Sequence, residues 1–190
     1  MYLFFDTETT GLPASWRSPV EDLKNWPRMV QAAWIIHDDH GNELASKNYI
    51  IKPEGFEIPE NAAKLHGITT KRAISEGFPL MDVLQEFKEA LAGADCLVGH
   101  NVSFDEKIIG AEFLRNSMKN YLAGMNTICT MLCATEYCAI ENQYGYKWPK
   151  LSELHFELFH SGFREAHNAA ADIKITAKCF WEMKRRGIIL

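Results

Sequence analysis

Two acidic residues close the first apolar segment of this 190-residue chain. The sequence begins with MYLFFDTE, in which Asp6 and Glu8 follow a run of apolar residues. We predict a strand over residues 1–6, because such a run is typical of a strand buried on both faces. Side chains alternate along a strand, so Asp6 and Glu8 point to the same side. Two carboxylates there are unfavourable without a cation, and since no Lys or Arg lies nearby in the sequence, a bound metal ion is the leading interpretation.

The rest of the pattern predicts an α/β protein. Further strands are expected at residues 29–37 and 43–51, and the short polar turns between them indicate an antiparallel meander. Beyond residue 51 the apolar residues recur at helical spacing. We expect one more strand at 94–99 and helices at 60–65, 79–92, 104–118, 126–138, 151–159 and 168–186. This order of elements favours an α/β fold with a mixed sheet.

Composition fits one globular domain over residues 1–190. The chain is 47% hydrophobic and 24% charged, with a formal net charge of −5. This balance argues against a basic nucleic-acid coat protein, but it allows an enzyme that holds phosphates through bound cations. Five cysteines without a C-x-x-C pair favour reduced thiols and a cytoplasmic location. Three of them lie close together in the sequence: Cys129, Cys133 and Cys138. They permit a zinc site, but buried apolar thiols on one helix are the better interpretation.

Two more acidic residues lie at expected helix positions. Ser103 and Glu106 have the spacing of a capping box, so we expect a helix to begin at Ser103 with Asp105 in its first turn. Asp172 falls on the buried stripe of the last helix, where an unpaired carboxylate is unfavourable. Taken singly, Asp105 also fits an ordinary first-turn residue, and Asp172 also fits a buried salt bridge.

His167 lies five residues before Asp172, at the expected start of the last helix. The helix dipole and nearby cations disfavour the imidazolium form, so a neutral ring there is suited to accept a proton from water. A structural hydrogen bond is the alternative for this residue.

The acidic residues together indicate a site for divalent cations. Four carboxylates from three elements repel one another, and two divalent cations relieve that repulsion. All-oxygen ligation suits Mg²⁺ or Mn²⁺ better than Zn²⁺. Two such ions about 3.5–4 Å apart stabilise the attacking and leaving oxygens in phosphoryl displacement. The four candidate ligands are Asp6, Glu8, Asp105 and Asp172.

Three motifs, taken in order, resemble those of the DEDDh 3′–5′ exonucleases. They are DTETTG from Asp6, HNVSFD from His100 to Asp105, and His167 with Ala169 and Asp172; LHGIT, from Leu65, also fits. The resemblance covers nearly the whole chain. It looks most similar to the epsilon proofreading subunit of bacterial DNA polymerase III, with ribonuclease T and oligoribonuclease as other relatives. It implies a ribonuclease-H-like fold with a five-stranded mixed sheet flanked by helices.

The resemblance also implies roles for individual residues. Asp6 would bridge two cations, with Glu8 and Asp172 completing the shell of the first and Asp105 holding the second. His167 would be the general base that deprotonates the attacking water. The positions that would touch the terminal nucleotide are Thr7, Thr9, Thr10, His66, Asn101 and Phe104. Phe104 also fits a plain core aromatic.

The implied reaction removes nucleoside 5′-monophosphates from single-stranded 3′ ends, with DNA expected over RNA. The alternatives are an RNA-directed exonuclease of the ribonuclease T or oligoribonuclease type, and a non-catalytic nucleic-acid-binding subunit. About four residues follow the last expected helix, so the C-terminal extension of epsilon-like proteins is not expected, which weakens the expectation of a DNA polymerase III partner. A homodimer remains open. Residues 14–28, which include Trp16 and Trp26, have no predicted role.

Overall fold

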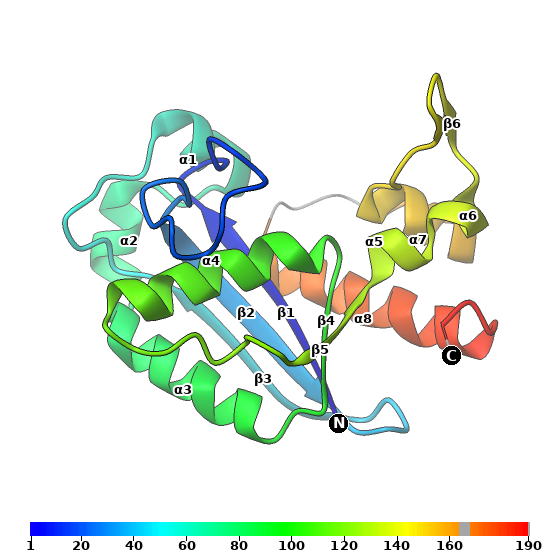
Figure 1. Cartoon of the computed structure of the whole chain (residues 1–190), viewed down its shortest axis with the longest axis horizontal. Helices are drawn as coiled ribbons and strands as arrows, with labels where there is room; N and C mark the ends of the chain where they lie inside the picture. The colour runs from blue at the N-terminus through cyan, green and yellow to red at the C-terminus, as the bar shows by residue number, and fades with distance from the viewer. Residues whose placement is uncertain (164–167, 190) are drawn as a thin grey trace.

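A five-stranded sheet forms the centre of the molecule (Figure 1). The computed structural model describes residues 1–163 and 168–189. The strand order is β3-β2-β1-β4-β5, in which β1 to β3 are antiparallel and β4 and β5 run parallel to β1. The predicted α/β fold with a mixed sheet is therefore confirmed. The strands are β1 (Tyr2–Thr9), β2 (Met29–His37), β3 (Glu43–Ile50), β4 (Cys96–Gly99) and β5 (Asn126–Cys129).

Helices cover both faces of the sheet. Helices α3 and α4 lie across one face, and α8 packs against the other (Figure 1). Helix α7 packs on α8, α5 and α6 lie next to α7, and α1 and α2 lie together near the end of β1 (Figure 1). The helices are α1 (Glu60–His66), α2 (Thr70–Glu76), α3 (Leu80–Ala92), α4 (Val102–Arg115), α5 (Thr130–Cys133), α6 (Thr135–Cys138), α7 (Leu151–Phe159) and α8 (Ala169–Arg185). Two short strands, β6 (Glu141–Asn142) and β7 (Gly145–Tyr146), form a separate hairpin.

The alternation of side chains along β1 decides which residues meet which helix layer. Phe4 contacts Phe180 of α8 with ring centroids 5.2 Å apart, whereas Phe5 contacts Phe87 of α3 at 5.7 Å. Because the side-chain period of a strand is two, the residues that follow inherit these sides. Even-numbered positions of β1, which include both acidic residues, therefore face α8, and Thr7 faces the α3 and α4 layer.

Several predicted boundaries are wrong. Strand β1 continues to Thr9, so Glu8 lies within the strand rather than beyond its predicted end at Asp6. Helix α4 begins at Val102, and its N-cap is Asn101 in a left-handed conformation (φ 72°) instead of Ser103. That backbone turn starts the helix earlier than a capping box would. Helix α2, which Thr69 caps by accepting from the Arg72 N–H, was not predicted at all.

The helix predicted over residues 126–138 is also wrong. Residues 126–129 form the edge strand β5, paired in parallel with β4, and only short helices follow. Thr127 and Ile128 are β-branched and suit an edge strand, but the apolar residues after them have helical spacing and obscured it. Cys129 and Cys138 are buried and Cys133 is exposed; all three are free thiols. Across the described residues they form no metal-ligand cluster.

No helix within residues 1–163 and 168–189 combines the length and the apolar character that crossing a bilayer would require.

Candidate active site at the carboxyl end of β1

Three of the four predicted acidic ligands converge where β1 ends. One carboxylate oxygen from each of Asp6, Glu8 and Asp172 lies within 4.8 Å of the others. The two β1 residues face α8 because of the strand alternation, and Asp172 lies in the first turn of α8. Asn168 caps that turn by accepting from the Ala170 N–H at 3.1 Å. A strand and a helix 160 residues apart in the sequence thus present their carboxylates to one point.

The electrostatics of this cluster are unfavourable for anions. Burial raises the pKa of Asp6 well above its usual value, and the charges of Asp105, Glu8 and Asp172 raise it further. Burial, followed by Asp172 and Asp105, raises the pKa of Glu8 to about 8. Among the described residues, the charged groups that shift the pKa of these two carboxylates are all acidic, so none of them offsets the repulsion. This set of oxygen donors fits hard divalent cations.

The fourth acid reaches the site from the opposite layer. Asp105 belongs to α4, and its Oδ1 accepts hydrogen bonds from the Thr7 backbone N–H (2.9 Å) and hydroxyl (2.6 Å). Only 3% of Asp105 is exposed, and burial raises its pKa to about 7 although the Thr7 hydrogen bonds act to lower it. Asp105 therefore lies outside the tight three-residue cluster, but close enough for its charge to raise the pKa of Asp6 and Glu8.

A buried amide that the sequence analysis missed connects β2 to α8. Gln31 lies opposite Glu8 in the β1–β2 register and is almost fully buried. Its Oε1 accepts from the Ala169 N–H at 3.3 Å, and its Nε2 donates to Asn48 Oδ1 at 2.7 Å. A polar residue within the apolar segment MVQAAWII was the available signal. This amide fixes the start of α8 beside Glu8.

Four of the six predicted nucleotide contacts line one cavity next to the carboxylates. The cavity has a volume of about 550 Å³ and is bounded in part by Glu8. Volumes of roughly 300–1,000 Å³ are usual for small-ligand sites. Leu12, which was not predicted, also lines it and is 74% exposed. The predicted residues that line it are Thr7, Thr9, His66 and Phe104.

His66 offers this cavity a hydrogen-bond donor. It is buried, and its Nδ1 accepts from the Ile68 N–H at 3.1 Å, which places the ring proton on Nε2. Nε2 makes no hydrogen bond of ordinary geometry with the described residues. Burial lowers the pKa of the ring, and an interaction with the Thr9 backbone partly offsets this by raising it. A neutral ring whose donor makes at most a weak contact with the protein is suited to a polar ligand.

The two other predicted nucleotide contacts, Thr10 and Asn101, do not line this cavity. Thr10 is tied to Arg28: its N–H donates to the Arg28 carbonyl at 2.9 Å, and its hydroxyl accepts from the Arg28 N–H at 3.0 Å. Asn101 lines a second cavity of about 740 Å³ rather than the first one. The predicted base, His167, lies outside the residues that the structure describes.

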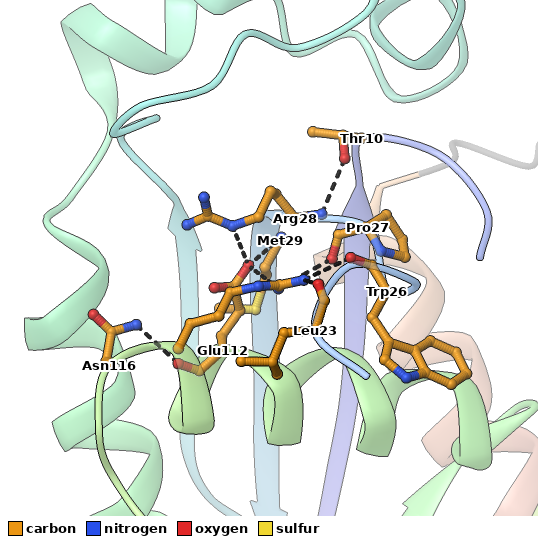
Figure 2. Close-up of polar contacts among 9 residues, drawn as sticks. Thr10, Leu23, Trp26, Pro27, Arg28, Met29, Glu112 and Asn116 are labelled. Atoms are coloured by element: carbon orange, nitrogen blue, oxygen red, sulfur yellow. Dashed lines mark hydrogen bonds and ion pairs between the residues drawn. The ribbon is translucent and has the colours of Figure 1, made fainter. Parts of the chain in front are cut away.

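The segment over residues 14–28 is fastened to α4 by a buried carboxylate (Figure 2). Glu112 is fully buried, and its Oε1 accepts from the Arg28 side chain (2.9 Å) and the Met29 N–H (3.0 Å). It also pairs with Arg115 at 3.0 Å. Arg115 in turn donates to the carbonyls of Leu23 and Trp26, each at 2.6 Å. A segment without regular structure is thereby held firmly beside the site.

This chain is similar in sequence to part of the PolC-type DNA polymerase III of several bacteria. The PolC-type DNA polymerase III of Streptococcus thermophilus is 33% identical over 117 residues, which are 62% of this chain and 7% of the polymerase. The corresponding protein of Lactococcus lactis is 31% identical over 117 residues, again 62% of this chain and 6% of that protein. The chain thus spans only a small fraction of these relatives.

Solved structures agree on the fold. Exonuclease I of E. coli, in complex with a dT13 oligonucleotide, superposes with a TM-score of 0.76 and 22% sequence identity. The match covers 97% of this chain and 41% of exonuclease I, and it confirms the predicted five-stranded, ribonuclease-H-like architecture. A family model described as "Exonuclease", of the RNase T type, matches residues 3–180. Because that match spans most of the sequence, the chain belongs to the exonuclease family, as a member of its DEDD 3′–5′ type.

Proposed function

We propose that this chain hydrolyses the last phosphodiester bond of a single-stranded 3′ end and releases a nucleoside 5′-monophosphate. Three carboxylates with oxygens within 4.8 Å of one another, beside a cavity of nucleotide size, carry the proposal. The raised pKa values of Asp6 and Glu8 support it, because acids held together in this way favour a cationic ligand. Membership of the exonuclease family supports the class of reaction.

We assign the cation ligands to the four acidic residues Asp6, Glu8, Asp105 and Asp172. Bound Mg²⁺ or Mn²⁺ ions would supply an activated water and stabilise the leaving oxygen. The role of Asp6 as the ligand that both cations would share is carried over from the family motif, and its charge interacts with those of the other three acids. Asp105 approaches from the α4 side, so we assign it to the second cation and the pair Glu8 and Asp172 to the first.

The other predicted residues bind and orient the substrate. His66 donates from Nε2 to the terminal nucleotide, and Phe104 presents its ring to the base within the same cavity. The proton of the attacking water is accepted by His167, whose role is carried over from the family motif. The hydroxyl of Thr9 donates to the Gly11 carbonyl at 2.6 Å and shapes the turn at the cavity rim.

We propose DNA as the preferred substrate. The names of the relatives support this choice, since they include DNA polymerase III and an exonuclease I bound to a dT13 oligonucleotide. An RNA-directed exonuclease is the second candidate. Association with a DNA polymerase III or with a second copy of the chain remains a prediction, which size-exclusion chromatography with and without a polymerase will check.

Labelled oligonucleotides test the proposal. Single-stranded DNA and RNA of equal sequence, labelled at the 5′ end, are incubated with Mg²⁺ or with EDTA. We expect a ladder of products that shorten from the 3′ end one nucleotide at a time, more quickly for DNA, and no products in EDTA. The His167→Ala variant should lower kcat by roughly 10²–10⁴-fold. Internal cleavage, or a rate that is unchanged by EDTA, would contradict the proposal.

A further inference from the structure

A second cavity lies next to the one beside the carboxylates. It has a volume of about 740 Å³ and lies along the start of α4, the edge strand β5 and the segment after it. Two exposed tryptophans line it, Trp16 at 53% and Trp148 at 63% exposure. Asn101 and Ser103 contribute polar groups, and the remaining wall is mostly apolar.

An aromatic pair joins the two cavities. Phe104 lines the first cavity together with Glu8, and Trp16 lines the second. Their ring centroids are 5.5 Å apart with an interplanar angle of 47°, so they are in direct contact. A ligand chain that leaves the first cavity across Phe104 therefore meets the ring of Trp16 next.

Hydrogen bonds to its backbone and to the neighbouring residue hold Trp16 in this position, although its side chain is exposed. Lys107 of α4 donates to the Trp16 carbonyl at 3.3 Å, and the neighbouring Ser15 exchanges two hydrogen bonds with Asn25, of 2.7 and 2.9 Å. The far end of the same segment is fixed by Glu112, as Figure 2 shows. A large apolar ring is thus presented to solvent on an anchored segment, which is the arrangement expected of a stacking surface.

We propose that the cavity between Trp16 and Trp148 binds the nucleotides that precede the 3′-terminal one, through stacking of their bases on these rings. The inference rests on the proposed function, because it extends the substrate from the carboxylate site. Continuity through Phe104 favours a nucleic-acid strand over a protein segment. Glu106 in the wall repels phosphate, so the bases face the wall and the phosphates face solvent.

Asn101 supports the same assignment. Its left-handed backbone (φ 72°, ψ 41°) starts α4, yet its side chain makes no capping hydrogen bond to the helix. An amide that is not used as a cap lines the cavity beside Trp16 and is available to a base edge or a sugar. We therefore expect Asn101 to contact the nucleotide before the terminal one, rather than the terminal nucleotide itself.

Substrates of two lengths test this inference. The p-nitrophenyl ester of thymidine 5′-monophosphate fills the terminal position and places only its small leaving group where the preceding sugar would lie, whereas an oligothymidylate extends well beyond that point. Trp16→Ala should raise KM for the oligothymidylate by about 5- to 150-fold, the range for loss of one stacked base. It should leave kcat/KM for the ester within about twofold, a change too small to reflect a lost contact. Trp148→Ala should act in the same direction, and Trp16→Phe should restore most of the loss.

A matched control and a binding measurement complete the test. Phe156 is 52% exposed, almost the same as Trp16, but it lies at a different cavity. Phe156→Ala should therefore leave the kinetic constants for both substrates unchanged. Fluorescence anisotropy of a labelled oligothymidylate in EDTA should show weaker binding for Trp16→Ala without any turnover. An unchanged KM, or an equal loss on both substrates, overturns the inference. If the wild-type protein hydrolyses neither substrate, the proposed function itself fails.

Discussion

The side-chain Oε1 of Gln31 accepts a hydrogen bond from the backbone N–H of Ala169 at 3.3 Å, which ties β2 to the first turn of α8. Gln31 also lies opposite Glu8 in the sheet register. One buried amide therefore links the sheet beside Glu8 directly to the helix that carries Asp172, in addition to the packing of α8 on β1 and β2.

Replacing that amide should loosen the cluster. Gln31→Met leaves the N–H of buried Ala169 without its acceptor, which should lower the free energy of unfolding by about 1–3 kcal/mol. We expect faster hydrogen exchange over residues 169–173 and weaker Mg²⁺ binding. Asn48→Ala is the control, since it removes only the outer partner of Gln31. Mg²⁺ affinity equal to that of the wild type in Gln31→Met would show that the amide stabilises the fold without positioning the site.

The hydroxyl of Thr7 should tune Asp105. It donates to Asp105 Oδ1 at 2.6 Å and favours the ionised carboxylate, whose pKa is about 7 with this bond in place because burial raises it. A hydrogen bond to a charged group is worth about 1.5–3 kcal/mol, so Thr7→Val should raise this pKa by about one to two units. NMR titration of the Asp105 carboxyl carbon in metal-free protein measures the change. Thr7→Ser keeps the hydroxyl and should titrate as the wild type does; a Val variant that also does so would refute the expectation.

The metal-free protein should lose stability as the pH rises. The folded-state pKa of Glu8 is about 8 and that of Asp105 about 7, above the values of about 4 in an unfolded chain. The folded state then binds more protons than the unfolded state, so this contribution is present below about pH 4 and is lost progressively up to about pH 8.

Divalent cations should reverse this loss because they bind the ionised carboxylates. We expect Mg²⁺ to raise Tm more at pH 8 than at pH 6, and Asp6→Asn to raise the Tm of metal-free protein at pH 8. Thermal melts in EDTA and in Mg²⁺ at both pH values check this. An equal effect of Mg²⁺ at pH 6 and pH 8 would contradict the electrostatic account of the site.

Much of the fold and of the acidic cluster could be predicted from the sequence, because the patterns that indicate them are local. Strand β2 and helix α7 begin and end at the predicted residues, since one is a mostly apolar run and the other an amphipathic repeat. The even spacing of Asp6 and Glu8 placed both on the α8 face. Asp172 was expected on the buried stripe of α8, and it lies in the first turn of that helix beside the β1 acids.

The rest depends on contacts between distant residues, which local patterns do not encode. Strand β5 exists because β4 offers it a parallel edge, and its four residues alone carry a weak signal. Asp105 reaches the site from α4, and its hydrogen bonds join it to Thr7, 98 residues earlier in the sequence. Likewise, nothing near residues 14–28 indicates that Glu112, far along the chain, fixes them.

The Glu112 cluster should contribute strongly to stability. Removing one partner of a buried ion pair leaves uncompensated charge, so Glu112→Ala should lower the free energy of unfolding by about 3–5 kcal/mol. Glu76→Ala is the matched control: Glu76 pairs with Arg72 at 2.9 Å and is exposed, so its loss should cost less than about 1 kcal/mol. Urea unfolding measures both. Equal effects of the two substitutions would show that burial of the Glu112 cluster has little energetic importance.

The central claim is that a strand and a distant helix build one cation site. Isothermal titration of metal-free protein with Mn²⁺ at pH 8 tests it most directly, with Asp6→Asn and Asp172→Asn as paired variants. We predict saturable binding by the wild type and at least a tenfold loss of affinity in each variant, about 1.4 kcal/mol or more. Wild-type affinity and stoichiometry in both variants would contradict the account, because the carboxylates of β1 and α8 would then not share a cation.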